Sequence, residues 1–339
     1  MIGPDYIAYR LTGNIQTDYC EASTSSLCDL KTGAWSEEIR RLLEFPRDIY
    51  PEIKGTCEVC GTVTKQWQEK FHFKQDVKVL TGTGDNPAAA IATGCFAKGY
   101  PVLSLGTSGV LMYPKKKINF EVKGKNILFS MDGKDVLILV QGVVQSTGSS
   151  LAWWVKNTLQ ADDFMEETTG VDLKHLGENE LMFYPHLVGD KTIYQDPELR
   201  GSFVGIGTDT TRKEMTIAVM EGIAFAVRQL VSVMGVSKEE LARLKVTGGG
   251  SKNEVWMQIL ADVLNTKVEQ LESGAGAGYG IALCAAAAGD ENLSMNDLIE
   301  QTVSIKNTFI PRQYNRELYE QKYQKYLRVY DALKHIYQE

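Results

Sequence analysis

The stretch VKVLTGTGDNPAAAIA, residues 77–92, decides the fold class. Its first residues, Val77 to Leu80, end a short apolar run with β-branched side chains, which predicts a β-strand. The strand runs into a glycine turn, residues 81–86, and the alanines of residues 87–97 then predict a helix. Pro87 stands in the first turn of that helix, where proline is favoured because a first-turn N–H has no intrahelical partner. This order of strand, glycine loop and helix is typical of α/β proteins.

The same order recurs further along the chain. Residues 101–105 predict a second apolar strand that ends in the glycine loop 106–109, and residues 244–246 predict a third that ends at residues 247–251. Further elements are expected as helices over residues 5–13, 37–43, 149–159, 212–234, 254–264 and 274–288, and as a strand over residues 136–140. The alternation predicts an α/β architecture throughout.

The composition is that of a soluble globular protein. At roughly 150 residues per domain, 339 residues suggest about two domains. The chain carries 36 basic and 43 acidic residues, a net charge of −7, so nothing in its charge favours nucleic acid or an anionic membrane as a partner. We find no apolar run of the roughly 18 residues that a membrane span needs and no signal-peptide pattern, and therefore expect a cytoplasmic protein.

Six cysteines are few for this length and suit a reducing compartment. Cys57 and Cys60 form a CxxC pair, but there is no second pair and no matching histidine pair to complete a zinc site. We therefore expect structural or incidental thiols and assign no metal ligand.

The glycine loops suggest a phosphate-binding site. A glycine loop at the carboxyl end of a strand lets backbone N–H groups approach a ligand, and the N-terminus of a following helix adds partial positive charge. The alternative is that these glycines only make tight turns. Three better-known patterns do not fit: the Walker A motif and the GxSxG nucleophile elbow are absent, and residues 274–280 resemble a dinucleotide fingerprint only loosely.

Asp85 is the carboxylate of most chemical interest because it directly follows a glycine turn, where a ligand cleft would open in an α/β sheet. Within reach of a hydroxyl group, it could accept that group's proton as the hydroxyl attacks a substrate. Asp is also a strong helix N-cap, and Asp85 directly precedes Asn86 and Pro87. Both interpretations stay open at this point.

The last predicted helix has an aromatic face. Beyond Pro311, five tyrosines and a leucine recur at spacings of three and four, namely Tyr319, Tyr323, Tyr326, Tyr330, Leu333 and Tyr337. We expect this helix to dock against the body of the protein, and binding of a partner is the alternative.

Taken together, these residues resemble the FGGY family of carbohydrate kinases, and within it most of all the xylulokinases. Four blocks carry the resemblance: PDYIAYRLTG at residues 4–13 with Thr17 and Asp18, GTGDN at 82–86 with LSLGTSG at 103–109, GSFVGI at 201–206 with AVMEG at 218–222, and TGGGSKN at 247–253 with Trp256 and Asp262. The blocks stand in the family's order and extend over most of the chain.

The resemblance implies an actin-like ATPase fold, in which two RNase-H-like domains hold ATP and a sugar in the cleft between them. Residues 1–100 would be the C-terminal part of the sugar-binding domain, residues 101–310 the nucleotide-binding domain, and residues 311–339 a C-terminal helix. The reaction would be the ATP-dependent phosphorylation of a ketopentose, D-xylulose to D-xylulose 5-phosphate. A homodimer is an open possibility for its assembly.

The resemblance also implies roles for individual residues. Asp85 would be the catalytic base and, with Asn86, would contact the sugar. The residues matching those around ATP are Gly106, Thr107 and Ser108 in a phosphate loop, Gly148 near the ribose and phosphates, and Gly249 and Asn253 around adenosine. Mg²⁺ would arrive with the nucleotide, so no protein ligand to the metal is assigned.

The sequence departs from the family pattern in two places. The first third of the pattern, with its first phosphate loop and an Mg²⁺-associated Asp, has no counterpart here, so we expect a truncated kinase that is not active alone. Residues 189–193 read GDKTI where xylulokinases usually show GERTP, which weakens the assignment of the sugar. Gluconokinase, ribulokinase, a non-catalytic nucleotide-binding fragment and a non-functional remnant are the alternatives.

Overall fold

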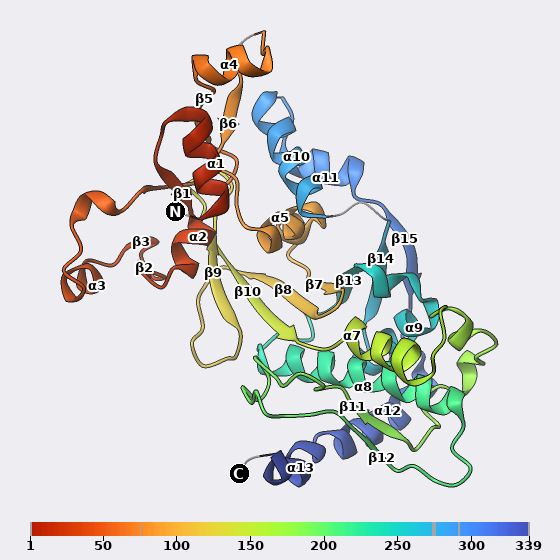
Figure 1. Cartoon of the computed structure of the whole chain (residues 1–339). Coiled ribbons are helices and arrows are strands. Elements are labelled where there is room, and N and C mark those ends of the chain that lie inside the picture. Colours follow the sequence, from red (N-terminus) through yellow and green to blue (C-terminus); the bar gives the residue numbers. More distant parts are fainter. Residues whose placement is uncertain (1, 75, 273–275, 291, 338–339) are drawn as a thin grey trace.

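The computed structural model describes residues 2–74, 76–272, 276–290 and 292–337. Its centre is a seven-stranded mixed sheet in the order β15-β14-β13-β7-β8-β10-β9 (Figure 1). The strands are β7 (Val102–Leu105), β8 (Gly109–Lys115), β9 (Lys125–Phe129), β10 (Leu137–Val144), β13 (Arg243–Thr247), β14 (Lys267–Leu271) and β15 (Ile305–Phe309). β7, β13 and β14 run parallel, whereas the other neighbouring pairs are antiparallel. The predicted α/β class is confirmed.

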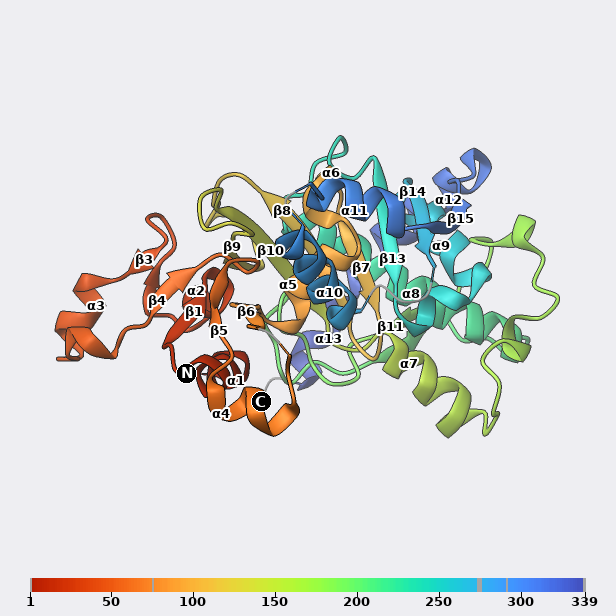
Figure 2. The same cartoon turned by 90° about the horizontal axis from the view of Figure 1, so that it is seen from above.

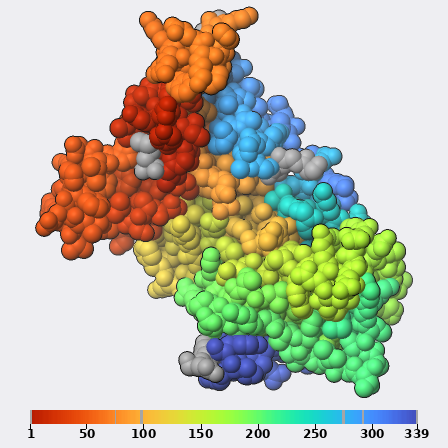
Figure 3. Space-filling model, viewed as in Figure 1, coloured from red at the N-terminus to blue at the C-terminus, as the bar shows by residue number. Residues whose placement is uncertain are grey.

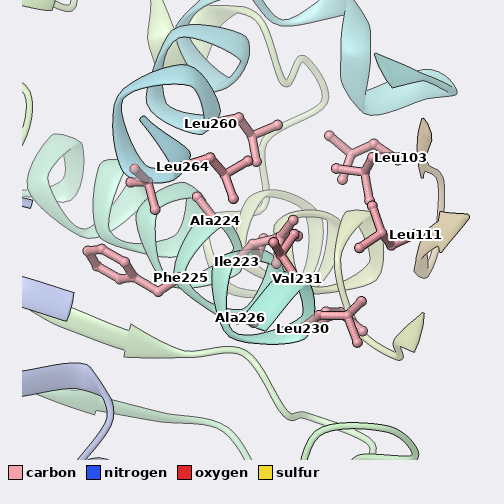
Figure 4. Packing of buried hydrophobic residues seen from close by; sticks show 14 of the residues in the cluster. Leu103, Leu111, Ile223, Ala224, Phe225, Ala226, Leu230, Val231, Leu260 and Leu264 are labelled. Carbon is pink, nitrogen blue, oxygen red and sulfur yellow. The ribbon is translucent and has the colours of Figure 1, made fainter. Parts of the chain in front are cut away.

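Two long helices form the core on one face of the sheet. α8 (Arg212–Val233) begins with a capping box, in which the Thr211 hydroxyl accepts a hydrogen bond from the Glu214 N–H and the Glu214 carboxylate accepts one from the Thr211 N–H. α9 (Glu254–Leu264) packs against it, and side chains such as Ile223, Leu260 and Leu103 interdigitate between the helices and the strands (Figure 4). This packing excludes water from the centre of the sheet.

α8 corrects one expectation from the sequence. It is 22 residues long and contains an 18-residue window that is apolar enough, by length and composition, to cross a membrane, although we expected no such run from the sequence. Of its most apolar window, 78% is buried inside the protein. Its apolar character is therefore explained by its place in the core.

Residues 2–80, apart from residue 75, form what we call the N-terminal limb, which projects from the β9 edge of the sheet (Figures 1 and 2). Its elements are α1 (Gly3–Thr12), β1 (Gln16–Asp18), α2 (Tyr19–Thr24), β2 (Cys28–Asp29), β3 (Ala34–Trp35), α3 (Glu37–Leu42), β4 (Glu52–Lys54), β5 (Val59–Thr62), α4 (Lys65–Phe71) and β6 (Lys78–Leu80). The strands pair only two by two, β1 with β4, β2 with β3 and β5 with β6.

The helix after the limb is shorter than predicted. α5 (Asp85–Ala92) ends where Thr93 and Gly94 break the chain, and α6 (Cys95–Lys98) follows. Gly94 has a φ of +69°, a left-handed conformation that glycine adopts readily, and it interrupts the single helix expected over residues 87–97. α5 packs very closely on α10 (Ala277–Gly289), because a Cβ on Gly280 would lie 1.9 Å from the Ala88 carbonyl oxygen.

Two further elements differ from the prediction. The second glycine loop leads from β7 into the antiparallel strand β8 rather than into a helix. The helix expected over residues 149–159 is α7 (Gly148–Ala152) followed by a wider π-helical turn, Trp153–Thr158. The remaining elements between β10 and α8 are β11 (Met182–Tyr184), β12 (Ser202–Val204) and the short 3₁₀ turns Glu166–Thr168 and Leu173–His175. The glycine run 274–280 resembles a dinucleotide fingerprint only loosely, and its residues 274 and 275 lie outside the described residues.

The C-terminal region docks against the body, as expected, but as two helices. α11 (Met295–Thr302) follows α10, and α12 (Gln313–Tyr326) and α13 (Val329–Tyr337) are separated by a turn at residues 327–328. Tyr319, Tyr323 and Tyr326 are buried around Phe225 of α8. The turn redirects the chain so that Tyr330 stacks on Tyr194, with ring centroids 4.0 Å apart.

Candidate active site

The loop between β7 and β8 is held by the chain at the start of α7. The Gly106 carbonyl accepts hydrogen bonds from the Gly148 N–H at 2.9 Å and from the Thr147 hydroxyl at 3.0 Å. The Thr107 carbonyl accepts from both the N–H and the hydroxyl of Ser149, each at 3.0 Å. A Cβ on Gly148 would lie 2.4 Å from the Gly106 carbonyl oxygen. Gly106 and Gly148, both assigned to the ATP site by the family resemblance, are thus direct neighbours, and only glycine at position 148 allows this approach.

The loop after β13 passes close to the end of β7. Gly248 has a φ of +93°, and a Cβ there would lie 2.7 Å from the Leu105 carbonyl oxygen. Gly249 differs, because a Cβ on it would meet nothing within 4 Å, so it faces open space. Asn253 caps α9: its side-chain oxygen accepts from the Trp256 N–H at 3.1 Å, and its amide donates to the Thr168 hydroxyl at 3.1 Å. Local turn and cap chemistry fixes the whole loop.

The two loops border one cavity of about 810 Å³. Five predicted nucleotide residues line it, namely Gly106, Thr107, Gly148, Gly249 and Asn253, whereas Ser108 does not. The volume lies within the roughly 300–1,000 Å³ that is usual for small-molecule sites. Residues far apart in the sequence therefore meet around a space that could hold a nucleotide.

Several residues that line the cavity were not predicted from the sequence. Trp153, Lys156 and Asn157 come from the segment after β10, and Phe164, Lys252 and Trp256 complete the aromatic and cationic part of the lining. Lys156 and Asn157 follow Trp153 by three and four residues, which puts all three on one face of a helical segment. That spacing was the signal that could have identified them.

Asp85 does not act as the helix cap. Gly84 occupies the N-cap position of α5 with no side-chain cap, and Asp85 is the first helical residue. Its Oδ1 accepts from the adjacent Asn86 N–H at 2.7 Å, and the residue is exposed. Neither Asp85 nor Asn86 lines the cavity. The Asp85 carboxylate is thus accessible to a substrate.

The loop that carries Asp85 is anchored to α2 by a buried carboxylate. The Thr83 hydroxyl donates to Asp18 Oδ2 at 2.5 Å, and Asp18 also accepts from the N–H groups of Cys20 and Glu21 at 3.2 and 3.0 Å. Burial raises the pKa of Asp18 to about 6, although these hydrogen bonds act to lower it. Burial also raises the pKa of Glu21, and the nearby charge of Asp85 adds to that effect. The surroundings of Asp85 are therefore acidic.

The GDKTI segment, residues 189–193, lies elsewhere. Asp190 is buried and accepts from the Tyr194 N–H at 2.7 Å, and one of its oxygens lies 3.4 Å from Nδ1 of His186. Tyr194 in turn stacks on Tyr330 of α13. None of residues 189–193 lines the cavity.

The described residues contain no group of three or more His, Cys, Asp or Glu side chains placed to hold a metal ion. All six cysteines are free thiols. The site therefore consists of backbone loops, an aromatic and cationic wall, and a separate exposed carboxylate.

A mixed sheet whose parallel strands end in glycine loops around a nucleotide-sized cavity defines the class: this is an actin-like ATPase fold. Residues 1–92 match the N-terminal domain and residues 102–289 the C-terminal domain of the FGGY family of carbohydrate kinases. The chain belongs to this family.

Similar proteins agree with that membership. A xylulose kinase from Bacillus subtilis (strain 168) is 30% identical over 337 residues, which cover 99% of this chain and 66% of the relative. A crystal structure of a xyloylose kinase from Brucella ovis superposes with a TM-score of 0.86 at 27% identity and covers 98% of this chain and 68% of that one. A gluconate kinase from Lactobacillus acidophilus shares the fold, with a TM-score of 0.83 at 24% identity over 99% of this chain and 68% of that one. The chain thus spans about two thirds of the length of these proteins.

Proposed function

We propose that this chain is the nucleotide-binding part, together with the catalytic base, of an ATP-dependent sugar kinase that converts D-xylulose to D-xylulose 5-phosphate. The supporting observation is the cavity, which is lined by five of the six residues that the family resemblance assigned to ATP. The similarity to xylulose kinases supports the choice of sugar. We place residues 1–100 in the sugar-binding domain, residues 101–310 in the nucleotide-binding domain and residues 311–339 in the C-terminal helices, and the protein in the cytoplasm.

The cavity would hold ATP between its two loops. Gly249 leaves room for the adenosine, and the aromatic rings of Trp153 and Phe164 offer apolar surface to the base. Lys156 and Lys252 bring positive charge to the lining. The N–H groups of Thr107 and Ser108 would point toward the phosphates. Mg²⁺ bound to ATP would neutralise phosphate charge, and we assign it no protein ligand.

Asp85 would take the proton from the sugar hydroxyl as its oxygen bonds to the γ-phosphorus. The bond from that phosphorus to the β,γ-bridging oxygen breaks, and ADP leaves. Asn86, beside Asp85 at the start of α5, would hold the sugar. Because little covalent chemistry falls to the protein, the main tasks of these residues are positioning and proton transfer.

Calorimetry with ADP tests the nucleotide site directly in the 339-residue chain. We expect one saturable site per chain. The Gly249→Val substitution should weaken ADP binding by at least about tenfold, or 1.4 kcal/mol, because a Cβ at this position has no neighbour within 4 Å and the side chain would occupy part of the cavity. Gly289→Val, at the end of α10 with equally open surroundings, is the matched control. Failure to bind ADP at millimolar concentration would contradict the assignment.

The sugar needs a separate test. A chimera that places the N-terminal third of the Bacillus subtilis xylulose kinase before this chain should phosphorylate D-xylulose in preference to gluconate and ribulose. The fold shared with a gluconate kinase makes gluconate the principal competitor. A preference for gluconate would replace xylulose in the proposal. ADP binding without transfer to any sugar would favour a non-catalytic nucleotide-binding module.

A further inference from the structure

The two thiols of the CxxC motif at residues 57–60 have different neighbours. Cys60 lies in β5, and its thiol is beside Gln16 of β1. Cys57 precedes β5 and meets Cys284 of α10, whose S–H donates a hydrogen bond to the Cys57 sulfur. Figure 3 shows the N-terminal limb, in red and orange, directly beside the blue surface that contains α10. The fold thus pairs two cysteines that are far apart in the sequence.

The paired thiols belong to one apolar cluster. Cys284 is buried with Ile91 of α5 and Phe129 of β9, and Cys57 packs against this cluster while remaining partly exposed. The hydrogen bond to Cys57, together with burial, raises the pKa of the Cys284 thiol. Cys57 is therefore the thiol that a dissolved reagent can reach, whereas burial shields Cys284.

The backbone is anchored on both sides of the pair. The Cys57 N–H donates to the Met131 carbonyl at 2.9 Å. Cys284 lies one helical turn beyond Gly280, where the backbone of α10 touches that of α5 at Ala88. Because the fold already holds the two sulfur atoms together, a bond between them would form with little further loss of conformational freedom.

The segment around Cys57 also supports the turn that leads to Asp85. The Thr56 carbonyl accepts a hydrogen bond from the Gly82 N–H at 3.0 Å. The helix that begins with Asp85, α5, packs on α10. A covalent bond between Cys57 and Cys284 would therefore join the support of the Asp85 turn to α10 and restrict movement of α5.

We propose that Cys57 and Cys284 form a redox-sensitive modification site, at which a low-molecular-weight disulfide such as glutathione disulfide converts the two thiols into a protein disulfide. The Cys57 thiolate attacks one sulfur of the reagent, the reagent's S–S bond breaks, and one thiol leaves. The Cys284 sulfur then attacks the Cys57 sulfur of this mixed disulfide, and the second thiol leaves. The protein loses two electrons and two protons, and the reagent gains both. The site does not depend on kinase activity.

Mass spectrometry of the alkylated protein tests the site in the 339-residue chain. After incubation with glutathione disulfide, we expect the peptide with Cys57 to be joined to the peptide with Cys284, and dithiothreitol should separate them. Cys57→Ser should abolish the cross-link, and Cys284→Ala should leave one glutathione on Cys57. Cys60→Ser, which removes the other thiol of the CxxC motif, is the matched control and should leave the cross-link unchanged. Circular dichroism verifies that each variant is folded.

Amide hydrogen exchange measures the consequence for α5. We expect exchange of residues 85–92 to be slower by at least about tenfold in the oxidised chain than in the reduced chain, whereas exchange of residues 313–326 in α12 stays the same. In Cys57→Ser, glutathione disulfide should leave the exchange of α5 unchanged.

Two results of the mass measurement would overturn the proposal. One is a disulfide between Cys57 and Cys60. The other is that Cys57 and Cys284 both stay free, or that Cys57 retains glutathione, in the wild-type chain with excess reagent. A cross-link that leaves the exchange of α5 unchanged would refute the restraint on the Asp85 turn.

Discussion

Substitution of Lys322 by methionine should destabilise the protein strongly. Lys322 of α12 forms an ion pair with Glu221 of α8 at 2.5 Å, and their side chains are only 6% and 1% exposed. Glu221 also accepts from the Tyr319 hydroxyl at 2.9 Å and from the Gly177 N–H at 3.2 Å. Without Lys322, the Glu221 carboxylate keeps these two neutral donors but loses the one cation among the three groups that contact it.

The size of the effect follows from the burial of the pair. Removal of one partner of a buried ion pair typically costs about 3–5 kcal/mol, because the remaining charge is left uncompensated. Replacement of both charges should cost far less. In the double variant Glu221→Gln with Lys322→Met, the glutamine oxygen still accepts from Tyr319 and Gly177, and we expect a loss of only about 1–2 kcal/mol.

Urea denaturation followed by tryptophan fluorescence measures these differences as changes in the free energy of unfolding. The single variant should unfold at a much lower urea concentration than the double variant. The reasoning is refuted if Lys322→Met costs less than about 1 kcal/mol, or if the double variant is no more stable than the single one.

Three further predictions concern the site. Gly148→Ala should destabilise the protein by about 1–3 kcal/mol in urea denaturation and weaken ADP binding in calorimetry, because its Cβ would press on the Gly106 carbonyl. Gly249→Ala, where a Cβ has room, should lower the free energy of unfolding by less than about 0.5 kcal/mol. Equal losses of stability in the two variants would contradict this explanation. The raised pKa of Asp18, about 6, means that the folded state binds a proton more tightly than the unfolded state, so its contribution to stability is present below about pH 4 and is lost as the pH rises to about 6. Compared with Asp18→Asn, which keeps a good N-cap, the wild type should therefore lose up to about 3 kcal/mol of unfolding free energy across that window, and a pH-independent difference would be evidence against the raised pKa. In the active chimera, Asp85→Asn should lower kcat by about 10²- to 10⁴-fold with little change in KM for the sugar, and near-normal turnover would exclude Asp85 as the base.

Local patterns were sufficient to predict the strands and loops around the cavity. Residues 102–105 are a mostly apolar run followed by Gly106, and the strand predicted over residues 244–246 lies within β13, which is followed by Gly248. The helix predicted at residues 254–264 is α9 itself. The clustering of Gly106, Gly148 and Gly249 came from the family resemblance, because no local pattern relates positions so far apart.

The errors came from interactions between distant segments. The sequence pattern of a strand followed by a glycine loop does not show whether a helix or a hairpin comes next. Here β7 pairs with β8 as an antiparallel hairpin. Asp85 was a good candidate for a cap by residue type, but the extended conformation of Gly84 moved the helix start by one residue. The C-terminal helix is interrupted by a turn at residues 327–328, and beyond this turn Tyr330 stacks on Tyr194, which no local pattern could show.

The contact between Gly280 and Ala88 has a mechanical consequence. Most packed helices are separated by a layer of side chains that can shift past one another. Here the backbones of α10 and α5 are in direct contact at Gly280 and Ala88. We therefore expect α5, which begins with Asp85, to tilt about this contact rather than to slide along α10. A change in the distance between Asp85 and the cavity would then be a rotation centred at Gly280.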